Sequence, residues 1–365
     1  MGFNCGILGL PNVGKSTLFN ALTSTQKAES KNYPFCTIDP NIGKVQVEDK
    51  RLKKISEISR SEKTIFNQLE FVDIAGLVKG ASKGEGLGNK FLSNLYSVDA
   101  LIHVVRCFED KDITHVDSKI SPINDINIIE TELLLSDLSK IENIIENLKK
   151  KNKGKIIDPQ LLTTLESAKK NLDNGIILRN CSQELGESRI LASYNLLTIK
   201  PMIYVCNVDE NSIITGNELS KQVERIANET STKVLNISAD IESEISLIEN
   251  LNEKQEFLLS IGLKETSLSK LIREGYDLLN LLTFFTSGIK ESRAWSCQKG
   301  SFAPDAGAKI HTDFKRGFIK AEVIDYLDFI EFKGEQNCKE KGKVRLEGKE
   351  YLVKDGDIMN FKFNV

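Results

Sequence analysis

Residues 9–16 read Gly-Leu-Pro-Asn-Val-Gly-Lys-Ser and match the pattern G-x-x-x-x-G-K-[ST] at every fixed position. An apolar run, Cys5 to Leu8, precedes the motif, and a helical pattern from Lys15 to about Leu22 follows it. A turn between a strand and a helix suits this motif, because main-chain N–H groups and the helix N-terminus converge there on a phosphate. The residues expected to bind a nucleotide here are Asn12, Val13, Gly14, Lys15, Ser16 and Thr17.

The same loop supplies two groups with chemical roles. We expect the Lys15 ammonium to reach the β- and γ-phosphates, where it also acts catalytically, and the Ser16 hydroxyl to ligate Mg²⁺. A second motif, Asp73-Ile74-Ala75-Gly76, ends a strand expected at Leu69 to Ile74. An Asp at such a strand end can hold Mg²⁺ through a water molecule, and the Gly76 N–H can sense the γ-phosphate.

A threonine in the polar linker upstream, Thr37, is the further expected ligand of Mg²⁺. The expected switch consists of Asp73, Gly76 and Leu77. Many nucleotide hydrolases place Gln directly after D-x-x-G, whereas Leu77 cannot orient an attacking water. His115 is the first candidate for that catalytic role, and Arg106 is the second.

A second histidine, His103, lies within an apolar strand expected at Ala100 to Val105. That position predicts a core histidine whose hydrogen bonds are satisfied.

The position that reads the base is expected after the apolar strand Met202 to Cys206, where the sequence is Asn207-Val208-Asp209-Glu210. A guanine site has N-K-x-D there, and its Asp accepts hydrogen bonds from guanine N1–H and N2–H₂. Val208 replaces the Lys, and Glu210, one methylene longer, replaces the Asp. A carboxylate placed for guanine is wrong for adenine, so the altered clamp favours relaxed or adenine-favouring selectivity.

Two further elements belong to this purine pocket. Asn207 is expected to orient the base, with Val208 packed beside it. Ser238 and Ala239, which follow the strand expected at Val234 to Ile237, are expected to complete the pocket through main-chain N–H groups.

Strands that alternate with helices predict an α/β P-loop NTPase with a doubly wound sheet of the Ras-like type. Residues 122–195 depart from this pattern, because two a/d seams separated by a turn predict an inserted antiparallel coiled coil. The seams are Leu134, Leu138, Ile141, Ile145 and Leu148, then Leu161, Leu165, Ala168 and Leu172. Its basic tip, Lys149 to Lys155, fits either a solvated turn or a phosphate-backbone contact. From about Leu281, short strands punctuated by glycine predict a small β-rich module.

Bulk composition limits the classes of partner. The formal net charge is −3, so no global basic field argues for nucleic acid. No apolar run approaches the ~20 residues that a membrane span needs, and the N-terminus lacks the charged region of a signal peptide. Seven scattered cysteines without a C-x-x-C pair argue against a disulfide framework or a zinc site and fit a reducing cytoplasm.

Several long motifs resemble the YchF/Obg-like ATPase family. They lie at residues 9–16, 32–41, 71–89, 103–110, 207–210 and 317–323. The resemblance implies an Obg-type G domain over residues 1–280, a coiled-coil insertion at 122–195 and a C-terminal TGS domain of β-grasp type over 281–365. The chain departs from the family at Gln298 to Gly307, which puts a partner contact by that loop in doubt.

The same resemblance implies function. It implies Mg²⁺-dependent hydrolysis of ATP in preference to GTP, association with the ribosome or its large subunit, and a cytoplasmic location. Carried over by position, residues 12–17 would bind ATP, Ser16 and Thr37 would ligate Mg²⁺, and Val208 would contact the base. His115 would be catalytic and Cys36 redox-sensitive.

Two alternatives stay open at this point. One is a guanine-specific GTPase translation factor, and the other is a nucleotide-gated RNA or protein adapter with little turnover. The expected partner is ribosomal RNA, contacted through the hairpin tip or the TGS domain. No membrane association is expected. A monomer is expected.

Overall fold

The computed structural model describes residues 3–29, 42–74, 89–110, 120–151, 158–181 and 189–364. Contacts within the chain divide it into two compact units, each of which is described separately. One unit spans Phe3–Lys44 and Glu70–Leu271 and is called the nucleotide unit. The other spans Val45–Leu69 and Ile272–Val365, together with the first two residues, and is called the C-terminal unit.

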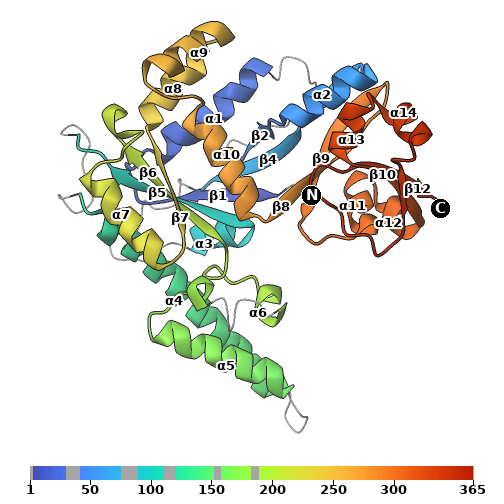
Figure 1. Ribbon diagram of the computed structural model, residues 1–365. Helices are drawn as coiled ribbons and strands as arrows, with labels where there is room; N and C mark the ends of the chain where they lie inside the picture. The colour runs from blue at the N-terminus through green and yellow to red at the C-terminus, as the bar shows by residue number, and fades with distance from the viewer. Residues whose placement is uncertain are drawn as a thin grey trace. The chain divides into compact units, whose positions relative to one another are not determined.

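A six-stranded sheet forms the centre of the nucleotide unit, in the order β2-β4-β1-β5-β6-β7 (Figure 1). Its strands are β1 (Asn4–Leu8), β2 (Ile42–Val47), β4 (Asn67–Asp73), β5 (Ala100–Cys107), β6 (Met202–Val208) and β7 (Lys233–Ile237). β1 pairs in parallel with β4 and β5, and the parallel pairing continues through β6 to β7. Every residue of β5 and β6 is buried, as expected of central strands in a parallel sheet covered on both faces.

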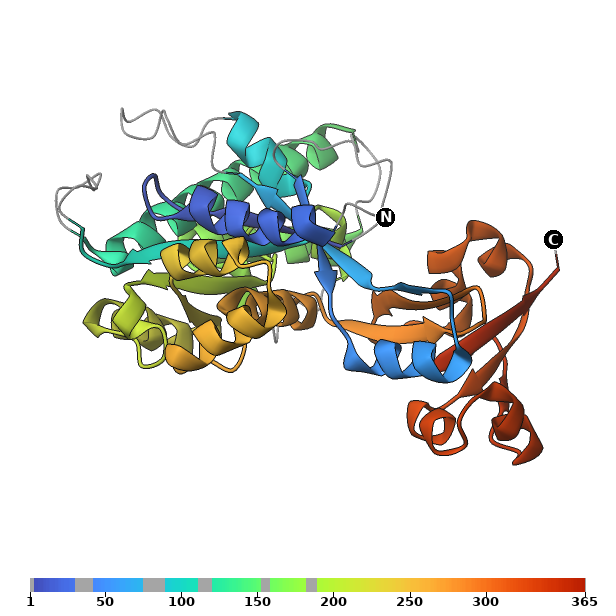
Figure 2. The ribbon, with the colours of Figure 1, turned by 90° about the horizontal axis from the view of Figure 1, so that it is seen from above.

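Helices cover both faces of this sheet. α1 (Lys15–Glu29) and α8 (Ala239–Leu247) lie side by side (Figures 1 and 2), and α4 (Pro122–Lys151) packs against β5 and α7 (Glu218–Glu229). Further helices of this unit include α3 (Asn89–Tyr96), α6 (Arg189–Ser193) and α9 (Leu251–Ser260), with short 3₁₀ turns η3 (Leu178–Cys181) and η5 (Glu210–Ser212). The division between the two units falls within α10 (Ser267–Leu278). This arrangement confirms the predicted doubly wound α/β sheet.

The predicted helical hairpin is formed by α4 and α5 (Pro159–Asp173), which extend away from the sheet (Figure 1). Ion pairs between Lys149 and Glu166, at 3.3 Å, and between Lys169 and Glu142, at 2.8 Å, show that the two helices run antiparallel. The seam residues fill one cluster: Ile141, Ile145, Leu165, Ala168 and Leu172 are buried in it, and Leu134, Leu138, Leu148 and Leu161 pack against it.

The C-terminal unit contains a mixed sheet in the order β11-β10-β12-β8-β9-β3. The strands are β3 (Lys63–Ile65), β8 (Leu281–Thr286), β9 (Glu291–Gln298), β10 (Phe318–Ile324), β11 (Arg345–Glu347) and β12 (Ile358–Phe363). β12 pairs in parallel with β8, and β3 with β9, whereas the other pairs for which a register is defined are antiparallel. Its helices are α2 (Lys50–Ser59), α11 (Ala303–Ile310), α12 (Thr312–Arg316), α13 (Tyr326–Glu331) and α14 (Glu335–Glu340).

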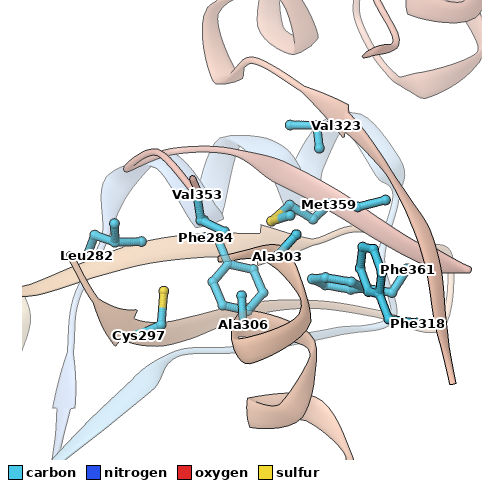
Figure 3. Packing of buried hydrophobic residues seen from close by; sticks show 11 residues of the cluster. Leu282, Phe284, Cys297, Ala303, Ala306, Phe318, Val323, Val353, Met359 and Phe361 are labelled. Carbon is cyan, nitrogen blue, oxygen red and sulfur yellow. The ribbon is translucent and has the colours of Figure 1, made fainter. Parts of the chain in front are cut away.

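Consecutive residues of these strands enter two different cores, because side chains alternate across a sheet. Phe284 points into a cluster with Ala306 of α11 and Phe361 of β12 (Figure 3), whereas Phe285 joins a cluster with Leu52 of α2. Phe284 and Phe361 meet edge-on, with ring centroids 6.1 Å apart. The C-terminal unit therefore needs α2, far upstream in the sequence, to cover one face of its sheet.

Residues 45–69 thus pack with residues 272–364, although the sequence places a domain boundary at residue 280. The division into a G domain over residues 1–280 and a TGS domain over 281–365 stays a proposal about sequence domains, distinct from these compact units. Among the helices that the structure describes, none has the length and apolar character to cross a membrane.

Candidate functional site: a phosphate loop and a purine-facing strand end

The loop between β1 and α1 adopts a conformation that only certain residues tolerate. Gly9 has φ of +149° and Gly14 has φ of +96°, both in the region that favours glycine. A Cβ at Gly9 would lie 2.3 Å from the Val104 carbonyl oxygen, and one at Gly14 would lie 2.2 Å from Asn207 Nδ2. Asn12 also has a positive φ, of +62°, which asparagine tolerates better than most residues. The two fixed glycines of the motif are therefore required by the backbone itself.

Lys15 stands at the first residue of α1 and is 5% exposed. Its ammonium donates to the Leu10 carbonyl oxygen, so the side chain folds back over the loop. Burial lowers the pKa of Lys15 to about 8, and the nearby Asp73 carboxylate opposes that shift. A partly desolvated ammonium beside a helix N-terminus is suited to a polyphosphate, whose negative charge compensates for the lost water.

Two oxygen donors for Mg²⁺ are described near this lysine. The Ser16 residue is exposed at the start of α1, and Asp73 ends β4, where it pairs in register with Ile7 of β1. The described residues hold no cluster of three or more His, Cys, Asp or Glu that could bind a metal alone. The Ser16 hydroxyl and the Asp73 carboxylate are oxygen donors of the kind that Mg²⁺ prefers, and the phosphates of a bound nucleotide would contribute others.

Five residues singled out from the sequence lie outside the described part of the chain. They are Thr37, Gly76, Leu77, His115 and Cys36. Their expected roles as Mg²⁺ ligand, switch, catalytic residue and redox-sensitive cysteine stay predictions. No disulfide joins any two of the six cysteines that the structure describes.

Asn207 connects three segments of the site. It is the penultimate residue of β6 and 7% exposed. Its Nδ2 donates to the Val13 carbonyl oxygen at 3.0 Å, and its Oδ1 accepts from the Ala239 N–H at 3.0 Å. One side-chain amide therefore joins the phosphate loop to the start of α8.

The remaining base-pocket residues surround this amide. Val208 is 2% exposed, whereas Asp209 and Glu210 are exposed at the end of β6. Ser238 is buried and caps α8, its hydroxyl accepting from the Ile241 N–H at 3.4 Å. The Ala239 N–H, expected to face the base, instead donates to Asn207 in this structure. Thr17, expected to support the α-phosphate, is half-buried in the first turn of α1.

Arg106 and His103 are both buried on β5 but differ in their hydrogen bonding. The Arg106 guanidinium donates to the carbonyl oxygens of Phe108, at 3.3 Å, and Asp110, at 3.2 Å, and lies over the Phe108 ring. Arg106 therefore shapes the loop after β5. His103 is a core residue as predicted, at 1% exposed, but the prediction that its hydrogen bonds are satisfied was wrong. Neither ring nitrogen has a partner among the described residues, and burial lowers its pKa to about 3, which keeps the imidazole neutral.

One residue near the base pocket was not found from the sequence. Asn217 precedes α7 and contacts both Cys107 and Asp209 through its side-chain amide. The pattern Asn217-Glu218-Leu219-Ser220 has the form of a capping box, which would have located the helix start but not these two contacts.

Comparison with known proteins addresses the whole chain. A family model described as "50S ribosome-binding GTPase" matches residues 4–137. The YchF-GTPase C-terminal model, described as "Protein of unknown function (DUF933)", matches residues 281–364. The chain is 52% identical over 366 residues to "Ribosome-binding ATPase YchF" of Haemophilus influenzae, with 100% of both chains covered. It is 47% identical over 371 residues to the protein of the same name from Bacillus subtilis, again with 100% of both covered.

A solved structure agrees with these matches. The Schizosaccharomyces pombe YchF GTPase superposes with a TM-score of 0.90 at 35% identity, covering 99% of this chain and 98% of that one. Identity of this extent over the full length, together with the shared fold, shows that the chain belongs to the YchF family.

Proposed function

We propose that this protein is a ribosome-binding, Mg²⁺-dependent ATPase that works as a nucleotide switch. The observation that carries the proposal is the loop at residues 9–16, whose two glycines, buried Lys15 and bond to Asn207 form a cradle for a polyphosphate. Relatives that are named ribosome-binding ATPases and match over the full length support the same function.

The residues present fit Mg²⁺ as well as the nucleotide. Ser16 would ligate the ion, with Thr37 as a further ligand and Asp73 acting through water. When bound, the ion would neutralise charge that develops on the phosphate oxygens. Lys15 would hold the β- and γ-phosphates and stabilise the transferred charge, and His115 would position the attacking water.

ATP is proposed in preference to GTP on the chemistry of the base pocket. Val208 is buried and apolar where a guanine site has Lys, and the exposed Glu210 replaces the Asp that reads guanine N1–H and N2–H₂. The names of the relatives differ on this point, since the bacterial proteins are called ATPases and the fission yeast structure is called a GTPase. Guanine-specific hydrolysis is therefore the second candidate, and retention of Asn207 favours it.

The ribosome, or its large subunit, is the proposed partner, which also implies a cytoplasmic location. Contact with ribosomal RNA through the hairpin tip would have to come mainly from the residues beyond Lys150. Lys149 pairs with Glu166 and Lys150 with Glu146, at 3.3 and 3.0 Å, so their charge is already partly compensated. The C-terminal module is the other proposed RNA contact, and a monomer is the proposed state.

A nucleotide competition assay tests the proposal. ATP and GTP should each be offered against a labelled adenine nucleotide with Mg²⁺ present, and turnover of both should be measured with and without ribosomal subunits. We expect ATP to compete more strongly and to be hydrolysed. A clear preference for GTP would support the second candidate, and binding without turnover on ribosomes would support a nucleotide-gated adapter. Lys15→Ala should abolish tight binding, and an unchanged affinity would contradict the assignment of the phosphate loop.

A further inference from the structure

A hydrogen-bonded network fixes the exposed end of β6 beside the base pocket. Asn217 Nδ2 donates to the Cys107 carbonyl oxygen at 2.7 Å and to Asp209 Oδ2 at 3.2 Å. The Ser212 hydroxyl lies 2.9 Å from each carboxylate oxygen of Asp209. The Asp209 carboxylate is therefore held in place by two side chains although Asp209 itself is exposed.

The network also joins the carboxyl ends of two neighbouring strands. Cys107 is the last residue of β5 and pairs in register with Val208 of β6. Asn217 bonds to the carbonyl of Cys107 and to the side chain that directly follows Val208. One side-chain amide thus adds a link between these strand ends, beside the main-chain pairing of Cys107 with Val208.

Asn207 and Asn217 fix the main chain on either side of Val208. Asn207, which precedes Val208, is fixed to the phosphate loop and to α8. Asn217 fixes Asp209, which follows Val208. The main chain from Asn207 to Asp209 is consequently held at both ends, so that the main chain of the buried Val208 has a fixed place beside the purine pocket.

The second function of Asn217 is separable from this one. Its Oδ1 accepts from the N–H groups of Leu219 and Ser220, at 3.1 and 2.9 Å, and so caps α7. The Ser220 hydroxyl completes the capping box at the Asn217 N–H. The cap uses the oxygen of the amide, whereas the contacts to Cys107 and Asp209 use its nitrogen. A substitution can therefore keep one function and remove the other.

We propose that Asn217 is a positioning residue for nucleotide selectivity, which acts by holding Asp209 and the end of β5 so that Val208 meets the base in a fixed place. This inference rests on the proposed nucleotide-binding function of the site. Asn217 does not touch the nucleotide in this scheme and belongs to none of the nucleotide-binding motifs discussed above.

Two substitutions remove the donor and keep the cap. Asn217→Ser and Asn217→Asp both retain an oxygen that can cap α7, because Ser and Asp are favoured N-cap residues. Asn217→Asp also places a second carboxylate beside Asp209. Asn250, the N-cap of α9, offers a matched control, since its Oδ1 accepts from the Asn252 N–H at 2.9 Å and its Nδ2 contacts only the neighbouring Glu253 among the described residues.

The experiment measures dissociation constants for ATP and GTP, together with kcat and KM, for the full chain and these variants. We expect Asn217→Ser to weaken ATP binding roughly five- to tenfold, less than the full loss of a hydrogen bond to a charged group, because the bond acts on the base only through the position of Val208. Asn217→Asp should weaken it further, and the ratio of ATP to GTP affinity should shift in both. kcat should stay within about twofold, because Lys15 and Ser16 are untouched. Asn250→Ser and Asn250→Asp should match the parent protein.

A purely structural role predicts a different result. It would lower the melting temperature or the fraction of active protein while leaving the ratio of ATP to GTP affinity unchanged, and that outcome would overturn the proposal. Equal ATP affinity of Asn217→Ser and the parent would overturn it too. If the parent binds neither nucleotide, the proposed function itself fails and the inference fails with it. If the parent prefers GTP, only the ATP preference is refuted, and Asn217→Ser should still change the ratio.

Discussion

Replacement of Asn207 by Ala should destabilise the nucleotide unit in the absence of any ligand. The substitution leaves the Val13 carbonyl and the Ala239 N–H without their partner, each at 3.0 Å in the structure. Asn207 is 7% exposed, so water has little access to replace it. Leaving one buried polar group unpaired costs about 1–3 kcal/mol, which sets an upper limit of about 6 kcal/mol for the two together. Because small main-chain shifts recover part of that cost, the free energy of unfolding should fall by about 2–4 kcal/mol.

Hydrogen exchange is the assay of choice. The single tryptophan, Trp295, lies in β9 of the C-terminal unit, so its fluorescence does not report directly on this site. Exchange of the amides in residues 9–18 and 202–212 should accelerate by roughly 30- to 1,000-fold, which corresponds to the same loss of free energy. Amides of β10 and β12 serve as an internal reference and should change much less.

A matched variant separates the effect of losing the two Asn207 hydrogen bonds from the general effect of replacing an asparagine in a strand. Asn236 lies on the neighbouring strand β7, and its Oδ1 is buried without a partner among the described residues. Asn236→Ala should therefore be close to neutral. The reasoning would be refuted if Asn207→Ala changed exchange in the phosphate loop by less than twofold, or if Asn236→Ala had an equal effect.

Three further outcomes follow from buried charges. Burial lowers the pKa of Lys15 to about 8, so the ATP affinity should not depend on pH below pH 8. Above pH 8 the ATP affinity should fall by up to about tenfold per pH unit, because the neutral amine must take up a proton to bind phosphate. Calorimetry at pH 9 in buffers of different ionisation heat should detect that proton uptake. Asp137→Ala should cost about 2–4 kcal/mol of unfolding free energy, measured by urea denaturation followed by circular dichroism, because the buried carboxylate accepts from the N–H groups of Leu197 and Thr198 and from the Thr198 hydroxyl. Lys200→Met should remove the ammonium that donates to the carbonyl oxygens of Leu95, Tyr96 and Val98, of which, among the described residues, only that of Tyr96 keeps a second donor, Asn195 Nδ2 at 2.7 Å. The end of α3 should then lose hydrogen-exchange protection by at least tenfold, whereas unchanged protection would contradict that role.

The local parts of the site were predictable because they depend on short spacings. The phosphate loop needs two glycines with positive φ, a lysine and a helix start, and all of these stand within residues 9–16. Strand ends were less predictable. The prediction ended β5 at Val105 and β6 at Cys206, whereas the strands continue to Cys107 and Val208. The ends of these two strands contain the polar residues Arg106 and Asn207, which can be buried only because they form tertiary hydrogen bonds.

Helix α1 was also predicted too short. It ends at Glu29 and not near Leu22, and its polar second half gives little apolar periodicity. Thr23 lies near the start of that half, and its hydroxyl donates to the Phe19 carbonyl at 3.0 Å within the helix. Periodicity reports the face that packs on the sheet, and it loses the signal where a helix continues beyond that contact.

The composition of the C-terminal unit could not be derived from neighbouring residues at all. β3 pairs with β9 through Lys63 and Glu291, which are separated by more than half of the chain. Asn217 was missed for a similar reason, because its partners lie on β5 and β6. Contacts of this kind depend on how distant segments meet, and a single sequence carries no spacing rule for them.

α2 and β3 are synthesised well before the rest of their unit, which begins at Ile272. During the synthesis of the nucleotide unit, the growing polypeptide therefore contains α2 and β3 without most of their packing partners. Leu52 and Ile55 of α2 are fully buried only once Phe285, Phe329 and Ile358 have emerged. A fragment that stops at residue 280 would leave this apolar helix face bare and prone to aggregate. A stable truncated protein for laboratory work would therefore have to omit α2 and β3, residues 48–66, and connect β2 directly to β4.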